Sequence, residues 1–200
     1  MENEPEIHVE ELKKDEAFLE NIKKLEVECK EEESIAKGYQ LLDAQLIIEA
    51  SEDEINEIFT FIVNTAFDRL AEKLSTFATF TMENEEERAA ARAIYEHGMQ
   101  RYSENDAKGA KEIFLILSHS VDKYSLKDAM LLHAAVVISG KSFDAFIDTI
   151  VDVSKVDEND PLAFFVQTFT QSIPQMFETY EKEVKVAREE IRVFADSQEK

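Results

Sequence analysis

Several residue types are scarce in this 200-residue chain, and each scarcity narrows its class. Tryptophan is absent and Cys29 is the one cysteine, which excludes an internal disulfide framework and a zinc site built from several cysteines. Four glycines and three prolines are few for a chain of this length, and their scarcity favours helix throughout. We find no alternating strand pattern with hairpin turn residues. The sequence therefore predicts an all-α fold.

Basic residues are also scarce. Lysine and arginine number 22 against 44 aspartates and glutamates, so the net charge is −22, and the first third of the chain is its most acidic part. A chain this acidic repels phosphate backbones and anionic lipid headgroups. We therefore expect neither nucleic acid nor a membrane surface as a partner, and cationic or hydrophobic partners remain open.

Long apolar runs are missing. The longest, Ala129 to Ile138, is interrupted by His133 and falls far short of the roughly 20 residues that cross a bilayer. The start, Met1 to Glu6, has neither a basic region nor an apolar region, so we expect no signal peptide and no stable membrane insertion. With 44% hydrophobic residues the chain is too apolar to be disordered. We expect a cytoplasmic, folded protein.

Composition shifts predict three sections: an acidic helical arm over residues 1–50, a helix and linker over 51–88, and a third domain over 89–200. In the arm we expect helices over 6–33 and 34–50. The first of these carries a narrow apolar stripe at helical spacing, formed by Leu12, Leu19, Ile22, Leu25 and Cys29. Such a stripe suits either a solvated helix or an arm that docks or forms a homodimer.

Ser51 and Glu54 form a capping box pattern, in which each side chain can bond the other residue's amide. The pattern predicts a helix from 52 to about 80, with a broad apolar face that needs another helix against it. The polar and acidic stretch from Met82 to Arg88 is the expected domain boundary.

A pattern then repeats every 35 residues. The repeated positions are Gly98 with His133, Asn105 with Gly140, and Ala110 with Ala145. A spacing of about 34 residues is typical of tetratricopeptide units, each a hairpin of two antiparallel helices. Ala110 suits a close helix crossing, and Gly140 suits a turn that needs a positive φ.

The repeat predicts a stack of three tetratricopeptide-like hairpins, because single hairpins cannot bury their own apolar faces. Asp160 and Pro161 open the third unit, and a long C-terminal helix over about 176–195 closes the stack. An ordinary helical bundle is the alternative interpretation.

Residues 90 to 185 resemble the tetratricopeptide class II chaperones of bacterial type III secretion, which bind translocators. The run from Ile94 to Tyr102 resembles the first helix of that family's first repeat, and the run from Ala110 to Leu117 resembles its second helix. Gly140 to Ala145 resembles the turn and helix of the second repeat, and Asp160-Pro161 resembles the start of the third.

The resemblance implies a groove that holds an extended segment of a hydrophobic secreted client, either a translocator or a gatekeeper-type protein, until export. Groove aromatics of the family correspond to Tyr95, Met99 and Tyr102, although methionine replaces the usual aromatic at position 99. Position by position, helical spacing extends this face through the later units. The predicted groove residues are Tyr95, Met99, Tyr102, Met130, Ala134, Val137, Phe165 and Phe169.

The same apolar residues also suit a packed core. We expect Phe114, Val137 and Phe164 to lie in the core, and Tyr95 and Tyr102 to be exposed in the groove. A scaffold or regulator that binds folded partners, outside secretion, is the alternative function.

Other motifs carry little chemistry. Ala135 to Ser142 meets the loose phosphate-loop pattern, but valines and isoleucine stand where glycines are needed. The four histidines lack metal-site spacing, and acidic neighbours would raise the pKa of Cys29. We therefore expect neither an enzyme, nor a metal site, nor a cofactor.

Overall fold

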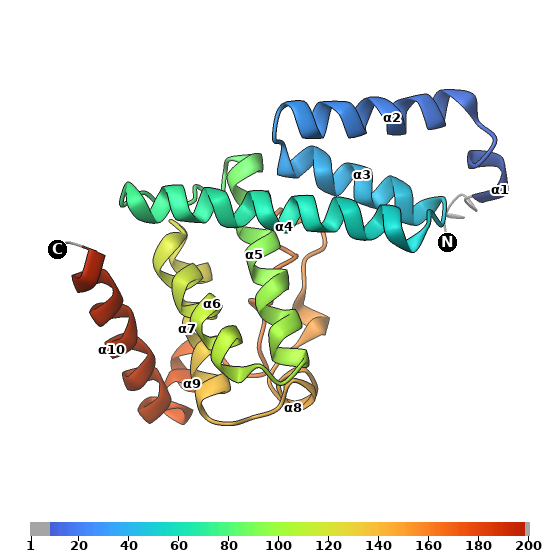
Figure 1. Cartoon of the computed structure of the whole chain (residues 1–200). Coiled ribbons are helices and arrows are strands. Elements are labelled where there is room, and N and C mark those ends of the chain that lie inside the picture. The colour runs from blue at the N-terminus through green and yellow to red at the C-terminus, as the bar shows by residue number, and fades with distance from the viewer. Residues whose placement is uncertain (1–8, 199–200) are drawn as a thin grey trace. The chain divides into compact units, whose positions relative to one another are not determined.

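The computed structural model describes residues 9–198 of the protein (Figure 1). Within this range the fold is all-α, as predicted, with no strand. The helices are α1 (Val9–Leu12), α2 (Glu16–Glu31), α3 (Ile35–Ile47), α4 (Glu52–Ser75), α5 (Glu85–Ser103), α6 (Ala107–Ser120), α7 (Tyr124–Ile138), α8 (Phe143–Thr149), α9 (Ile173–Thr179) and α10 (Glu181–Gln198). The predicted helix start at residues 6–8 and the segment Met1 to Glu6 lie outside the described residues.

The chain divides into two compact units, residues 1–66 and 67–200. The division falls inside α4, whereas the sequence predicted boundaries after residues 50 and 88. α4 runs unbroken through this division, and its buried apolar face continues across it. Ile62 and Ala66 are buried before the division, and Leu70 is buried after it.

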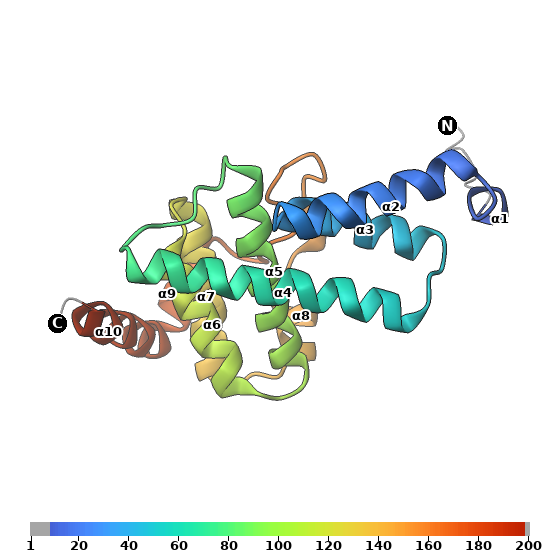
Figure 2. The ribbon, with the colours of Figure 1, turned by 45° about the horizontal axis from the view of Figure 1, so that its top comes forward.

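In the first unit, α2 and α3 lie side by side as a helical hairpin (Figures 1 and 2). The single helix predicted over 6–33 is instead broken before α2. Asp15 caps α2, and its carboxylate accepts hydrogen bonds from the amides of Ala17 and Phe18 at 2.9 and 3.1 Å. An aspartate that caps a new helix cannot also continue the old one.

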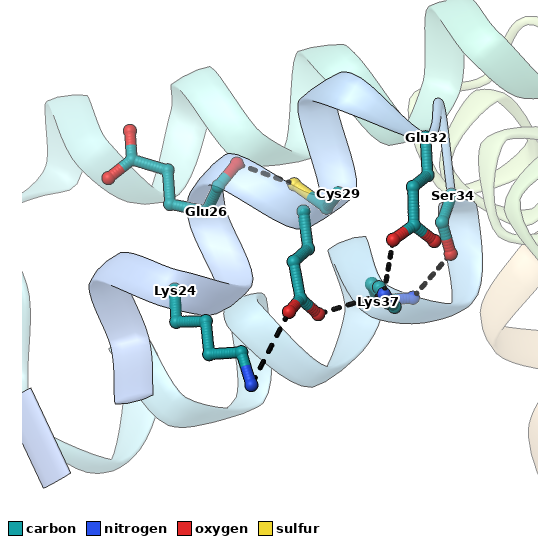
Figure 3. Close-up of polar contacts among 7 residues, drawn as sticks. Lys24, Glu26, Cys29, Glu32, Ser34 and Lys37 are labelled. Atoms are coloured by element: carbon teal, nitrogen blue, oxygen red, sulfur yellow. Dashed lines mark hydrogen bonds and ion pairs between the residues drawn. The ribbon is translucent and has the colours of Figure 1, made fainter. Parts of the chain in front are cut away.

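Charged side chains clamp this hairpin together (Figure 3). The Nζ of Lys37 on α3 lies 2.8 Å from a Glu28 carboxylate oxygen and 2.9 Å from one of Glu32. Lys24 approaches Glu28 from the other side at 3.5 Å, and the hydroxyl of Ser34 caps α3 by accepting the Lys37 amide. The two glutamates raise the pKa of Lys37 above its usual value, chiefly through the hydrogen bond to Glu28.

The predicted capping box is present at the start of α4. The Ser51 amide donates to the Glu54 carboxylate at 2.9 Å, and the Glu54 amide donates to the Ser51 hydroxyl at 3.3 Å. The helix ends at Ser75, five residues before the predicted end, and Phe77 follows with a φ of 54°. This left-handed residue terminates the helix.

In the second unit, α5, α6 and α7 form two consecutive helical hairpins, consistent with a stack of helical repeats. Asn84 and Asp106 cap α5 and α6 with their side chains. The turn residues match the repeat: Asn105 has a φ of 65° and Gly140 a φ of 78°, both left-handed. Equivalent positions of the 35-residue repeat therefore make equivalent turns.

Gly98 permits the close approach of α5 and α6. A Cβ atom at this position would lie 2.8 Å from Cγ2 of Ile113 and 3.0 Å from Cε1 of Phe114. Both neighbours are buried, with exposed fractions of 8% and 0%. The two helices can therefore meet at this distance only with glycine.

The predicted hairpins differ from the structure after α7. The second helix of the second predicted hairpin is reduced to the seven residues of α8. Residues 160–172, which were expected to begin a third hairpin, form turns and irregular chain. β-Branched residues are dense from Ile147 to Val153, where α8 ends early, and they lower helix propensity. The C-terminal helix predicted over 176–195 is present as α9 and α10, which are interrupted at Tyr180.

α10 packs against α7 and α6, as a closing helix should. Nζ of Lys111 on α6 lies 2.6 Å from a carboxylate oxygen of Glu190 on α10. The partly buried pair fixes the register of α10 along α6.

Replacing Gly98 by alanine is expected to lower the free energy of unfolding by roughly 1 kcal/mol net. Overpacking against Ile113 and Phe114 costs about 1–3 kcal/mol, while alanine gains about 1 kcal/mol of helix propensity. Urea unfolding of the purified variant measures the difference. A gain in stability of about 1 kcal/mol, as at an open helix position, would contradict the close approach.

Candidate functional site in the aromatic interior

The eight predicted groove residues all lie in the second unit, and most of them are in its interior. Met99 is partly exposed. The other seven expose at most 5% of their surface: Tyr95, Tyr102, Met130, Ala134, Val137, Phe165 and Phe169. The prediction that Tyr95 and Tyr102 lie exposed in an open groove is wrong, because the chain covers them with its own residues.

Irregular chain between α8 and α9 covers Tyr95, whereas Phe143 and Phe146 of α8 lie against Tyr102. We call residues 161–170 the cover segment. Its Leu162, Phe165 and Phe169 are buried, whereas Phe164 is 52% exposed. The sequence placed Phe164 in the core, and that prediction is wrong: its ring lies 3.6 Å from the Arg92 guanidinium, a cation–π contact at the surface.

A chain of hydrogen bonds joins the cover segment to α5 and α7. The amide of Val166 donates to the Tyr95 hydroxyl oxygen at 3.1 Å, and the same hydroxyl lies 3.2 Å from Nε2 of His133. Nδ1 of His133 lies 2.7 Å from the carbonyl oxygen of Ala129. Since a carbonyl oxygen only accepts, Nδ1 carries the proton, Nε2 accepts, and the Tyr95 hydroxyl donates to it.

Aromatic rings surround His133 on several sides. The ring centroids of Phe146, Phe114, Tyr95 and Phe169 lie 4.9, 5.1, 5.6 and 6.0 Å from that of the imidazole. These rings come from α8, α6, α5 and the cover segment. His133 therefore joins four parts of the second unit that are distant in sequence.

Burial sets the ionisation of this cluster. Removal from water lowers the pKa of His133 to about 4, against an opposing contribution from its bond to Ala129. Burial likewise raises the pKa of the Tyr95 hydroxyl well above its usual value. Both groups are therefore neutral at neutral pH, which the hydrogen bonds between them require.

Tyr102 anchors the other end of the interior. Its hydroxyl donates to the carbonyl oxygen of Lys141, and its ring centroid lies 5.7 Å from that of Phe143 and 5.9 Å from that of Phe146. Burial raises the pKa of Tyr102 to about 12. The tyrosine thus fixes the turn between α7 and α8 against α5.

The cover segment forms no helix, and its backbone bonds to the chain that follows α8. The Asp152 amide donates to the Thr168 carbonyl at 3.0 Å, and the Thr170 amide donates to the Ile150 carbonyl at 2.8 Å. Together with the Val166 bond to Tyr95, these contacts hold the segment as irregular chain. The interior of the second unit therefore binds a non-helical segment through aromatic rings and one tyrosine hydroxyl.

The other motifs of the sequence fall on helices and on contacts between helices. Val136 and Val137 of the phosphate-loop pattern belong to α7, so no strand precedes Gly140. His97 contacts Phe67, and His119 contacts Phe194, each by an edge-to-face arrangement. Within residues 9–198 no three potential metal ligands gather, and no helix there has the length and apolarity needed to span a bilayer.

The sequence indicated His133 only as the repeat equivalent of Gly98 and as the polar residue within an apolar run. One signal could have revealed more: a histidine within an otherwise apolar run needs hydrogen-bonding partners, and a tyrosine is the natural donor. The Val166 amide carries no such signal, because any backbone can supply it.

Comparisons of the chain with protein-family models, with curated proteins and with solved structures find no match. The resemblance to secretion chaperones therefore rests on the residues quoted above.

The buried imidazole predicts a specific pH dependence. Because the pKa of His133 is lowered to about 4 from 6.5, the unfolded chain binds a proton more readily between these values. The free energy of unfolding should fall as the pH drops from about 6.5 toward 4, by up to about 3 kcal/mol from this residue.

Urea unfolding of the wild type and of His133→Phe at a series of pH values isolates this contribution, because other groups titrate alike in both proteins. The stability difference between them should shift toward the variant as the pH falls. Parallel curves from pH 7 to pH 4 would contradict the burial of a neutral His133.

Proposed function

We propose that the protein is a chaperone of the type III secretion kind, which holds an extended apolar segment of a secreted client until export. The observation that carries the proposal is the irregular segment already seated on the inner residues of α5 and α7. Two phenylalanines, Phe165 and Phe169, enter the aromatic interior, and the Val166 amide bonds the Tyr95 hydroxyl. The interior thus has the chemistry for holding a polypeptide segment.

The helical arrangement supports the same function. Consecutive hairpins present the inner faces of α5 and α7, which the resemblance assigns to client binding. Tyrosine and methionine suit such a surface, because a tyrosine offers a large ring with a polar end and a methionine adapts its shape. Met99 is the predicted groove residue that remains partly exposed, so a client can reach it without unfolding the core.

The net charge contributes to this function. A client segment rich in apolar residues would aggregate when uncovered. A chaperone with a net charge of −22 keeps the complex dispersed through repulsion between complexes. Client binding requires no cofactor in this proposal, because binding alone stabilises the bound state.

Met99→Ala should weaken client binding by roughly tenfold, about 1.4 kcal/mol, if Met99 contacts the client. Gln100→Ala is the matched control, since Gln100 neighbours Met99 on α5 and is exposed. Affinity capture from cells that natively make the protein, followed by mass spectrometry, identifies the client, and titration of the purified pair measures affinity.

We expect a secreted protein with an apolar segment to be captured by the wild type and by Gln100→Ala, and to be depleted with Met99→Ala. Capture of folded, non-secreted partners alone would contradict the proposal and favour a scaffold that acts outside secretion.

A further inference from the structure

The cover segment contains no helical residue, and exposed chain flanks it on both sides. Residues 153–160 before it are exposed, and so are residues 171–172 after it. Its hydrogen bonds to the rest of the chain run to residues 149–155, to Asp160 and to the Tyr95 hydroxyl. The segment is thus tethered by exposed chain at both ends, and it can leave the interior without breaking a helix.

The buried side chains of the cover segment define what the interior accepts. Phe165 lies with its ring centroid 5.2 Å from that of Tyr95, and Phe169 lies 6.0 Å from His133. Both are nearly fully buried, whereas the adjacent Phe164 points to the surface and stacks on Arg92. Two aromatic side chains four residues apart therefore enter the interior, and the aromatic side chain directly before the first of them does not.

A hollow of about 480 Å³ borders the start of the cover segment. Its lining includes Pro161 and Leu162 of the segment, together with Met82, Arg88 and Asp122. The hollow leaves room for another polypeptide beside Pro161 and Leu162, where the cover segment would begin to lift.

We infer that the cover segment stands in for a partner's segment and is displaced from the interior when that partner binds. This inference rests on the proposed function and names the partner's chemistry. The partner presents an extended stretch with two aromatic side chains four residues apart. A backbone amide just after the first aromatic replaces that of Val166 at the Tyr95 hydroxyl.

The geometry explains why the partner has to compete. His133 is fully buried among rings of α5, α6 and α8 together with Phe169 of the cover segment. The free protein thus keeps its binding surface covered and out of water, which protects it from association with other apolar chains. Removing Phe165 and Phe169 should therefore expose a site for the same sequence supplied from outside.

The probe is a fluorescein-labelled synthetic peptide with the sequence of residues 161–170, titrated by fluorescence anisotropy against full-length proteins. Phe165→Ala combined with Phe169→Ala should bind the peptide at least tenfold more tightly than the wild type. Phe164→Ala is the matched control and should behave as the wild type. A peptide with serine at the positions of Phe165 and Phe169 should not bind the double variant.

Equal binding by the double variant and the wild type would overturn the inference. Binding of the serine peptide as strong as that of the original would overturn it as well, since the aromatics would then not select the partner.

Hydrogen exchange of the wild type tests the same inference without relying on the fold of a variant. Amides of residues 162–170 should exchange at least tenfold faster than the interior amides of α5 and α7, because the segment lifts while the helices stay folded. Equal exchange rates would show that the segment opens only on global unfolding, and would overturn the inference.

The inference and the proposed function fail separately. If the peptide binds the double variant but no secreted protein is captured, the displacement stands and the secretion role is wrong. If a client is captured while the amides of the cover segment exchange hydrogen as slowly as those of α5 and α7, the client binds elsewhere and the displacement is wrong.

Discussion

The hydrogen-bond chain through His133 is the constraint on which the interior of the second unit depends. Burying an imidazole without hydrogen-bond partners would cost more free energy than the apolar contacts around it contribute. Each of its ring nitrogens therefore needs a hydrogen-bond partner. Ala129 satisfies one nitrogen and Tyr95 the other. The Tyr95 oxygen then needs a donor, and the Val166 amide supplies it. One histidine in α7 thereby determines how α5 and an irregular segment pack.

This constraint links the fold to the proposed function. In a helix the Val166 amide would donate to a backbone carbonyl. Here it donates to the Tyr95 hydroxyl instead, and Phe165 and Phe169 of the same segment pack into the interior. The second unit thus handles non-helical chain within an all-helical fold, which is what a chaperone for extended segments has to do. The first unit is held by different forces, an α2–α3 hairpin clamped by Lys37 with Glu28 and Glu32.

Much of the fold could be predicted from sequence because the signals are local. The capping box at Ser51 and the 35-residue repeat located α4 to α7, with turns at Asn105 and Gly140. The cover segment could not be predicted, because Leu162, Phe165 and Phe169 recur at helical spacing while the chain there is irregular. Long-range bonds to Tyr95 and Ile150 determine that conformation, and no local pattern reports them. For the same reason the sequence predicted Tyr95 and Tyr102 to be exposed, whereas the chain buries both.

The most direct test of this account is the protonation state of His133, read from the nitrogen chemical shifts of its ring by NMR of the full-length protein across pH. The account predicts a neutral ring protonated at Nδ1, with Nε2 as acceptor, that persists down to a pH near 4. A ring that is protonated at Nε2, or that titrates near 6.5 as in solvent, would contradict it. Neither result is compatible with a closed chain from Ala129 to Val166.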